Sequence, residues 1–320
     1  MDAVDAPLAQ RGFVTRAEAL ARGMTDKQLG AEVRAGNLTR FRQGTYASTQ
    51  QWRSLDAQGR HLLRLSAVMA SLGDAVRASH VSSALMNGLD VWGVDLSRVH
   101  VTRVDGGAGR HEGDVVHHVG QVDEAADVVV VDGMGCTAPT RAAVEVGLIS
   151  TPESFLVTAD SLLRKGLATH SQLARRYGDM ECWPESQKLQ LAVRMADGAA
   201  GSVGESRLRW LLWGHGIPAP VLQYEVRRPG VDPTCRPFAT CDLAWPELGL
   251  IIEFDGLVKY GRLLRPGQTP SDAVIAEKLR EDGIRECTGF QVIRVTWADL
   301  EHPSALVARV RRALGLTAAA

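Results

Sequence analysis

The sequence predicts a multidomain α/β protein, and three observations lead to this fold class. The chain has 320 residues, a length that favours two or three domains over one. Segments with helical periodicity alternate with short runs rich in β-branched residues. Small residues in "MADGAAGSVGES", around Gly198, predict a linker or an exposed turn. We therefore expect three segments, at 1–50, 51–185 and 198–316.

Charge and apolar patterning limit the class of protein. The chain has 36 Lys and Arg against 37 Asp and Glu, which argues against a protein that binds polyanions over its whole surface. A local basic face is still compatible with this balance. The sequence shows no signal-peptide pattern, and no apolar run approaches the roughly 20 residues of a membrane-spanning helix. We expect a cytoplasmic protein with no membrane partner.

The cysteines indicate a reducing environment. Their number is odd, and they are scattered without a CxxC pair, at Cys136, Cys182, Cys235, Cys241 and Cys287. This pattern favours reduced thiols over disulfides. A zinc site formed by Cys235, Cys241 and a distant histidine is the less favoured alternative.

The first segment has the layout of a winged helix-turn-helix. Thr15 precedes Glu18 by three residues and Thr25 precedes Gln28 by three, so two helices are expected to begin with capping boxes. Gly23 suits the turn between these helices, and "GNLTRFRQGTYAS" predicts a small hairpin, the wing.

Three arginines of this segment are the candidate DNA contacts. Arg34 ends the second helix, and Arg40 and Arg42 lie in the expected wing, where phosphate contacts are common in such folds. The alternative is that these arginines only solvate a small helical domain.

The second segment mixes helices and strands without a catalytic pattern. "RVHVTRV", "DVVHHVG" and "ADVVVVDGMGCT" predict strands, whereas "HLLRLSAVMASLG", "TRAAVEVGLIS" and "ESFLVTADSLLRKG" predict helices. His117 and His118 are adjacent, so in a strand they face opposite sides and cannot share one metal ion. We interpret them, with His80, His100 and His111, as structural or surface residues.

A family resemblance covers these two segments. "RGFVTRAEALARGMTDKQLGAEVRAGNLTRFRQGTYAS", "HVSSALMNGLDVWGVDLSRVHVTRVDG" and "TAPTRAAVEVGL" resemble the N-terminal and middle regions of AbiEi-type antitoxin-domain proteins. The resemblance implies DNA binding by the winged helix, often at the operon's own promoter.

The third segment contains acidic residues in apolar strands. "GESRLRWLLWGHGIP" predicts a helix with Glu205 in its first turn, and "CDLAWPELGLIIEFDG" predicts a hairpin. With Glu247 and Leu248 as a two-residue loop, Trp245 faces Leu250, Ala244 faces Ile251 and Asp242 faces Glu253. Alternation then places Asp255 on the same face as Glu253.

Carboxylates gathered in this way predict a cation site. Burying them without compensation costs several kcal/mol each or raises their pKa values, so a divalent cation would relieve the repulsion. A set of oxygen ligands suits Mg²⁺ or Mn²⁺. The alternative is an ion network in which Arg207, Arg280 or Arg285 pairs with the carboxylates, and a different turn length would also shift the facing pair.

A second resemblance covers residues 200–316. "GESRLRWLL", "CDLAWPELGLIIEFDG" and "EKLREDGIRECTGFQVIRVTWADL" resemble the PD-(D/E)XK nuclease superfamily, within it the very-short-patch-repair (Vsr)-like endonucleases. The resemblance implies a restriction-endonuclease-like α/β domain with a mixed central sheet. It also implies that Asp242 and Glu253 are the metal-binding acid pair and that Glu205 is the acid of the preceding helix.

One position departs from the superfamily pattern. Two residues after Glu253 a lysine is usual, and this chain has Asp255. Lys259, or Lys278 on the following helix, could supply the missing charge, although Lys278 also fits a solvated salt bridge with Asp282 and Arg285.

Two functions from different classes follow. The first is a Mg²⁺- or Mn²⁺-dependent DNA endonuclease with Glu205, Asp242, Glu253, Asp255 and Lys278 as candidate site residues. The second is an antitoxin-like transcriptional repressor whose nuclease domain has lost activity. DNA is the expected partner of both, and a cognate toxin or a second copy of the chain is a further candidate.

Overall fold

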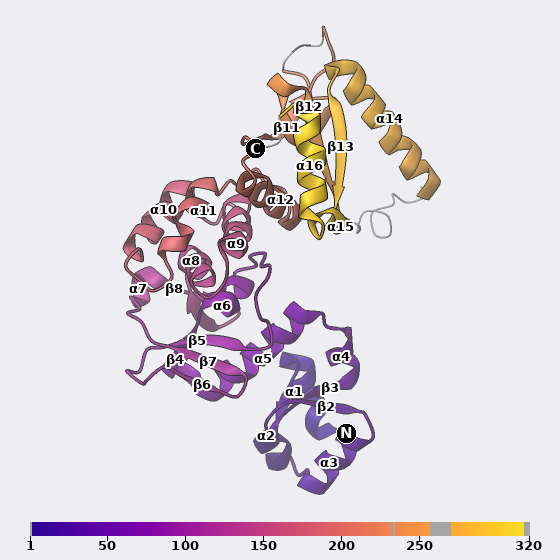
Figure 1. Cartoon of the computed structure of the whole chain (residues 1–320). Coiled ribbons are helices and arrows are strands. Elements are labelled where there is room, and N and C mark those ends of the chain that lie inside the picture. Colours follow the sequence, from indigo (N-terminus) through magenta and orange to yellow (C-terminus); the bar gives the residue numbers. More distant parts are fainter. Residues whose placement is uncertain (1, 231, 233, 257–269, 317–320) are drawn as a thin grey trace. The chain divides into compact units, whose positions relative to one another are not determined.

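The structure is a computed structural model that describes residues 2–230, 232, 234–256 and 270–316 (Figure 1). The described residues form a mixed α/β protein with sheets of three, four and six strands, so the predicted α/β class is confirmed. Two compact units are present: Met1–Ser154 with Arg175–Gln187, and Phe155–Ala174 with Lys188–Ala320. Among the described helices, none combines the length and apolarity needed to cross a bilayer.

The N-terminal part of the first unit contains the expected two capped helices and hairpin. The elements are α1 (Asp2–Arg11), β1 (Val14–Thr15), α2 (Arg16–Ala21), α3 (Asp26–Arg34), β2 (Leu38–Arg42) and β3 (Thr45–Ser48). Both predicted capping boxes are present, at Thr15 with Glu18 and at Thr25 with Gln28. Gly23 has φ +88°, a conformation that glycine adopts without strain. The strands form an antiparallel sheet in the order β1-β3-β2.

The rest of the first unit is built on a six-stranded mixed sheet. Its order is β6-β7-β5-β4-β9-β8, with β5 parallel to β7 and β4 parallel to β9. The strands are β4 (Val76–Ala78), β5 (Val99–Arg103), β6 (Arg110–Glu112), β7 (Val115–His118), β8 (Val128–Val131) and β9 (Met134–Thr137). The helices are α4 (Thr49–Ser54), α5 (Ala57–Leu72), α6 (His80–Met86), α7 (Glu124–Asp127) and α8 (Pro139–Leu148). All strands and helices expected at 57–148 are confirmed.

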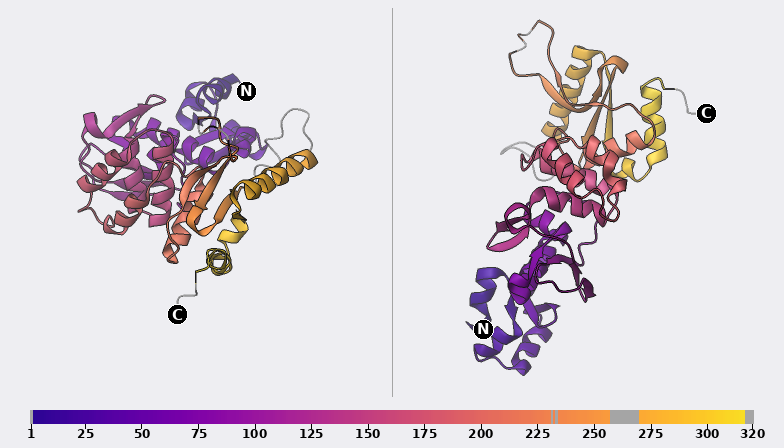
Figure 2. Two further views of the ribbon diagram at one scale, coloured as in Figure 1. Left: turned by 90° about the horizontal axis from the view of Figure 1, so that it is seen from above. Right: turned by 90° about the vertical axis from the view of Figure 1, so that its left-hand side faces the viewer.

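The second unit contains a four-stranded sheet in the order β10-β11-β12-β13. The strands are β10 (Val221–Val226), β11 (Ala239–Trp245), β12 (Leu250–Asp255) and β13 (Gln291–Thr296); the first three are antiparallel, and β13 is parallel to β12. The helices are α11 (Gln190–Met195), α12 (Val203–Gly214), α14 (Pro270–Thr288), α15 (Trp297–Leu300) and α16 (Pro303–Ala313). Figure 2 shows α14 and α16 on opposite sides of the sheet.

Two apolar clusters cover the two faces of this sheet. Leu250, Ile252 and Phe254 pack with residues of α12 and α16, whereas Ile251 packs with Ile284 of α14. The predicted alternation along the strand is therefore confirmed. The hairpin pairs Trp245 with Leu250 and Ala244 with Ile251, as predicted. The turn differs from the expected two-residue loop: Pro246–Leu248 form a 3₁₀ turn, and Gly249 follows with φ +66°.

The division between the two compact units runs through α9 (Pro152–Arg164) and α10 (His170–Asp179). The helix α9 contributes most of its residues to the second unit, while α10 is shared between the two. Within the second unit, the buried carboxylate of Asp160 joins α9 to α12. It accepts hydrogen bonds from Arg209 Nη1 (2.8 Å) and Ser206 Oγ (2.6 Å) of α12 and from the backbone of Asp197 (2.8 Å).

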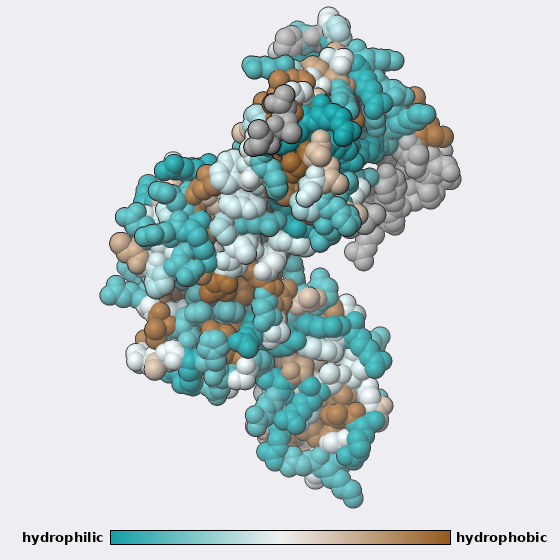
Figure 3. Space-filling view, viewed as in Figure 1, coloured by the Kyte–Doolittle hydropathy of each residue, from teal (hydrophilic) through white to brown (hydrophobic). Residues whose placement is uncertain are grey.

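Exposed apolar side chains are few among the described residues. They include Val130, Ile275 and Leu279, and hydrophilic residues predominate on the face shown in Figure 3. Scattered exposed apolar residues are normal on protein surfaces, so they suggest no function by themselves.

Replacing Arg209 with methionine is expected to destabilise the second unit strongly. The change leaves the Asp160 carboxylate buried without its cation, which typically costs about 3–5 kcal/mol. The free energy of unfolding can be measured by urea denaturation followed by tryptophan fluorescence. Arg312→Met, at an exposed position, is the control and should change it by less than about 0.5 kcal/mol. If Arg209→Met and Arg312→Met lowered the free energy of unfolding equally, the Arg209–Asp160 pair would not have this stabilising role.

Candidate functional site

The first acid of the site lies at the start of α12. Ser202 caps the helix, and the Glu205 carboxylate accepts hydrogen bonds from the Gly201 backbone N (2.7 Å), Ser202 Oγ (2.9 Å) and Gln223 Nε2 (3.3 Å). Only 5% of Glu205 is exposed. The carboxylate is thus held in one orientation, as the expected acid in the first helical turn.

The second acid, Asp242, lies where the backbone pairing of β11 with both neighbouring strands is interrupted. The β10–β11 register pairs Leu222 with Leu243 and Tyr224 with Cys241 but skips Gln223 and Asp242 between them. Gln223 has φ +49°, which accounts for the break in its strand. The β11–β12 register ends at Leu243 and Ile252, one residue short of the predicted pairing of Asp242 with Glu253. Asp242 Oδ2 instead accepts a hydrogen bond from the Phe254 backbone N (2.8 Å).

The third acid, Glu253, faces α14. Its Oε1 lies 3.1 Å from Arg280 Nη2, and the same nitrogen donates to the Thr240 carbonyl at 2.8 Å. The Cys241 thiol hydrogen-bonds to Glu253. Burial and the neighbouring Glu253 charge raise the pKa of Cys241 to about 12, so this thiol stays protonated and serves as a donor.

Asp242 acts electrostatically on both glutamates of the site. Burial is the largest cause that raises the pKa of Glu205 and of Glu253, and the charge of Asp242 is the second cause for both. Their carboxylates, however, do not have the close spacing of ligands on one ion. Among the described residues, only His80, His100 and His118 have ligand atoms that all lie within 4.8 Å of one another. At least one acid would have to move for a single cation to touch all three.

The other predicted residues of this site have different positions. Asp255 ends β12 and pairs with Thr296 of β13, two residues beyond Glu253 on the same strand. Lys278 is exposed on α14. Among the residues that the structure describes, the cation in contact with Glu253 is Arg280, one of the arginines considered as an alternative partner. Lys259 lies outside the described residues.

The three arginines predicted to contact DNA differ in their exposure and in their ion pairs. Arg34, in the last turn of α3, and Arg40, in β2, are exposed. Arg42 is partly buried, and its Nε lies 2.9 Å from Asp114 Oδ1. A phosphate contact by Arg42 would compete with this ion pair, so Arg34 and Arg40 are the better candidates.

The sequence does not predict the histidine cluster, because its members are expected there to be structural or surface residues. His80 begins α6, His100 lies in β5, and His118 ends β7. His100 Nδ1 lies 2.9 Å from His118 Nε2. As predicted, His117 and His118 do not belong to one group: His117 Nε2 lies 3.7 Å from Glu112. No short-range spacing signals the cluster, because it depends on the pairing of β5 with β7.

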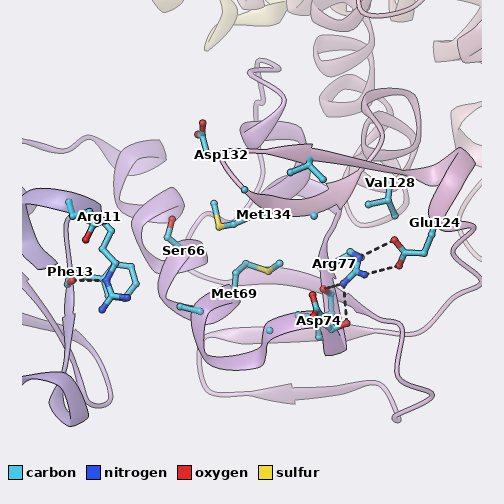
Figure 4. Close-up of a pocket in the computed structure, with 17 residues that line it drawn as sticks. Arg11, Phe13, Ser66, Met69, Asp74, Arg77, Glu124, Val128, Asp132 and Met134 are labelled. Carbon is cyan, nitrogen blue, oxygen red and sulfur yellow. Dashed lines mark hydrogen bonds and ion pairs between the residues drawn. The ribbon is translucent and has the colours of Figure 1, made fainter. Parts of the chain in front are cut away.

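A cavity of about 750 Å³ in the first unit has no predicted role. It lies between α5, β4 and the β8–β9 hairpin on one side and the N-terminal segment around Arg11 and Phe13 on the other. Arg77 points into it and pairs with Glu124 (3.0 Å), as Figure 4 shows. Its lining lacks the convergent catalytic groups that would define a reaction.

Comparisons with known proteins give relatives but no family. No family model matches the sequence. Two Mycobacterium tuberculosis proteins, uncharacterized protein Rv2248 of strain ATCC 25618 / H37Rv and uncharacterized protein MT2308 of strain CDC 1551 / Oshkosh, are each 27% identical over 296 residues, 91% of this chain and 97% of theirs. The crystal structure of the RV2827C protein from Mycobacterium tuberculosis is 16% identical, covers 70% of this chain and 82% of that chain, and has a TM-score of 0.39.

Asp242→Asn is expected to stabilise the metal-free protein at neutral pH by roughly 1 kcal/mol, because it removes the charge that disfavours ionised Glu205 and Glu253. Both pKa values are raised in the folded state, so the folded protein loses stability as pH rises through them. The gain should therefore be present at pH 7–8 and disappear below about pH 4. Urea denaturation in EDTA measures it.

Glu247→Gln is the matched control, because Glu247 is an exposed acid in the turn of the same hairpin. It should change stability by less than about 0.5 kcal/mol at either pH. A loss of stability in Asp242→Asn at pH 8 would mean that Asp242 has a structural role that outweighs its repulsion of the other acids.

Proposed function

We propose that this protein is a metal-dependent DNA endonuclease whose active site is formed by Glu205, Asp242 and Glu253. The observation that carries the proposal is the position of Asp242, whose charge raises the pKa of both Glu205 and Glu253; the three acids come from one helix and two strands. Carboxylates whose pKa is raised by burial and by a neighbouring acid are a recurrent feature of functional sites. The same arrangement without a cation would only destabilise the fold.

The order of elements in the second unit supports the proposal. The resemblance to PD-(D/E)XK nucleases implies a helix with an acid, a hairpin with Asp and then Glu, a helix with basic residues and a final strand. The chain has these elements as α12, the β11–β12 hairpin, α14 and β13. Each acid lies on the element that the resemblance assigns to it.

The residues have separate roles in the proposed mechanism. Glu205, Asp242 and Glu253 would hold Mg²⁺ or Mn²⁺, which lowers the pKa of a bound water and offsets charge on the phosphate. The Ser202 and Gly201 donors orient Glu205, and the Cys241 thiol orients Glu253. Arg280, rather than Lys278, is the cation at Glu253 and the candidate for stabilising charge on the scissile phosphate. Asp255 would be a further oxygen ligand for the cation.

A second candidate function is DNA-binding repression without cleavage. Two observations favour it: Asp255 stands where the superfamily has a lysine, and Arg280 already pairs with Glu253 at 3.1 Å. An arginine that neutralises Glu253 weakens the need for a metal cation. In this case the exposed arginines of the N-terminal segment would carry the function.

The cleavage prediction separates the two functions. Supercoiled plasmid and labelled single- and double-stranded oligonucleotides are incubated with the full chain in Mg²⁺, Mn²⁺ or EDTA. Metal-dependent cutting is expected, and Asp242→Asn and Glu253→Gln should each reduce its rate by about 100-fold or more, because each removes a ligand of the cation. Glu247→Gln should cut like the wild type.

Arg280→Lys adds a sharper test of the cation at Glu253. A lysine there keeps the charge but loses the planar guanidinium, whose Nη2 contacts both Glu253 and the Thr240 carbonyl. If Arg280→Lys still cuts DNA measurably and Arg280→Ala does not, the positive charge at position 280 has a catalytic role. If the wild type binds DNA but cuts none of these substrates, the endonuclease proposal is excluded and the repressor is favoured.

DNA binding is predicted to depend on Arg34 and Arg40. Each is exposed on α3 or β2, so Arg34→Ala and Arg40→Ala should weaken binding and each lower the slope of log K against log salt by roughly 1. Arg42→Ala is the matched control, because its ion pair with Asp114 leaves it less available to a phosphate. Titration by fluorescence anisotropy at several salt concentrations measures the slope. Unchanged slopes for Arg34→Ala and Arg40→Ala would exclude this DNA-binding surface.

A further inference from the structure

Three histidines of the first unit converge although they are far apart in the sequence. His80 follows β4, His100 lies in β5, and His118 ends β7. The strand β5 pairs with β7 in parallel, with Thr102 opposite His118, so His100 and His118 lie on the same face two residues apart. A hydrogen bond from the Ser79 backbone N to the His100 carbonyl (3.1 Å) brings His80 to the same place.

The spacing of the ring nitrogens is close to that of metal ligands. One ligand atom of each histidine lies within 4.8 Å of the others. His100 Nδ1 and His118 Nε2 are 2.9 Å apart, and the His80 and His118 rings stack with centroids 3.7 Å apart. Two imidazole nitrogens on a tetrahedral Zn²⁺ are roughly 3.3 Å apart, given Zn–N distances of about 2.0–2.1 Å. His100 and His118 would therefore have to separate by a few tenths of an ångström. The stacked rings, with interplanar angles of 18° and 19°, would also have to turn so that their nitrogen lone pairs point at one ion.

His80 is held in place by contacts outside the cluster. Its backbone has φ +51°, an uncommon conformation for a residue other than glycine. Ser79 Oγ lies 3.0 Å from His80 Nδ1, which leaves Nε2 for a metal ion, and the backbone N donates to Glu145 Oε2 at 3.0 Å. Metal-binding histidines commonly have their second nitrogen held in this way.

The charges around the cluster are balanced by buried acids. Glu145, which is fully buried, lies 3.9 Å from His80 Nδ1 and accepts from Arg141 Nε (2.8 Å) and Thr137 Oγ1 (3.0 Å). Asp127 also pairs with Arg141, at 2.5 Å. Arg141, a cation near His80, is thus neutralised on two sides, which limits its repulsion of a metal ion.

The imidazoles are neutral at physiological pH, the form that binds metal. Burial lowers the pKa of all three, that of His100 to about 2 and that of His118 to about 4, with the neighbouring histidines adding to the shift of His100. His80 and His100 are buried, whereas His118 is partly exposed and gives solvent access to the cluster.

We propose that His80, His100 and His118 bind one Zn²⁺ ion, with a fourth position open to water or another ligand on the side of His118. Three neutral nitrogen donors suit Zn²⁺ and other borderline transition metals rather than Mg²⁺, which prefers oxygen. This site is independent of the proposed endonuclease, because its ligands come from the first unit and share none with the acids of the second. The alternative is a metal-free cluster in which His100 and His118 share a hydrogen bond.

Zinc binding by the full chain tests the proposal. The protein is stripped with a chelator, dialysed and titrated with Zn²⁺ against a chromophoric competitor, and Co²⁺ is added in parallel as a spectroscopic probe. One equivalent of Zn²⁺ is expected per chain, with Co²⁺ absorption in the visible range at the intensity of a four-coordinate site. His118→Gln and His100→Gln should each weaken Zn²⁺ binding by about 100-fold or more and remove the Co²⁺ signal.

Two control variants show whether Zn²⁺ binding is specific to the three histidines. His111→Gln changes an exposed histidine of the neighbouring strand β6 and should bind like the wild type. The double variant Asp242→Asn/Glu253→Gln should also keep its Zn²⁺ equivalent, which separates this site from the acids. His118 is partly exposed, so its variant should retain the fold, as circular dichroism can verify. Lack of stoichiometric Zn²⁺ binding by the wild type, or equal binding by folded His118→Gln, would overturn the proposal.

Discussion

In the candidate site of the second unit, the negative charge of Asp242 repels the charges of Glu205 and Glu253. Folding places these acids together although their charges disfavour it, and burial makes the repulsion stronger because the local dielectric is lower. The surrounding structure compensates only in part: Glu205 has three donors, Glu253 has Arg280 and Cys241, and Asp242 accepts from the Phe254 backbone. Retaining such strain is typical of functional sites rather than of stable cores.

Most of the fold follows from local signals in the sequence. The Thr15 and Thr25 capping boxes, the β-branched runs and the two-residue alternation in β12 depend on neighbours within a few positions, and all three are confirmed. The hairpin register was predicted at Trp245–Leu250 and Ala244–Ile251. The break at Gln223 was not, because a positive φ in a non-glycine residue depends on the strand packed against it.

The features that the sequence does not predict are contacts between elements that are far apart in the chain. Lys278 and Arg280 both lie on α14, and only the rotation of that helix on the sheet decides that Arg280 contacts Glu253. The contact between α9 and α12 includes the buried ion pair of Asp160 with Arg209. The histidine cluster depends on a parallel pairing between β5 and β7, whose partners are not adjacent in sequence. Each of these features is a tertiary contact between elements that are individually predictable.

The two candidate sites differ in the chemistry of their donors, and this difference has a consequence for the protein as a whole. Oxygen donors at Glu205, Asp242 and Glu253 carry negative charge and select hard cations, whereas the neutral nitrogens of His80, His100 and His118 select borderline ones. A cation that fills one site therefore competes weakly for the other. Because the ligands belong to different units, one site can be lost without disturbing the other. A variant without the three acids would still retain the three histidines, because they belong to the first unit, which also carries Arg34 and Arg40.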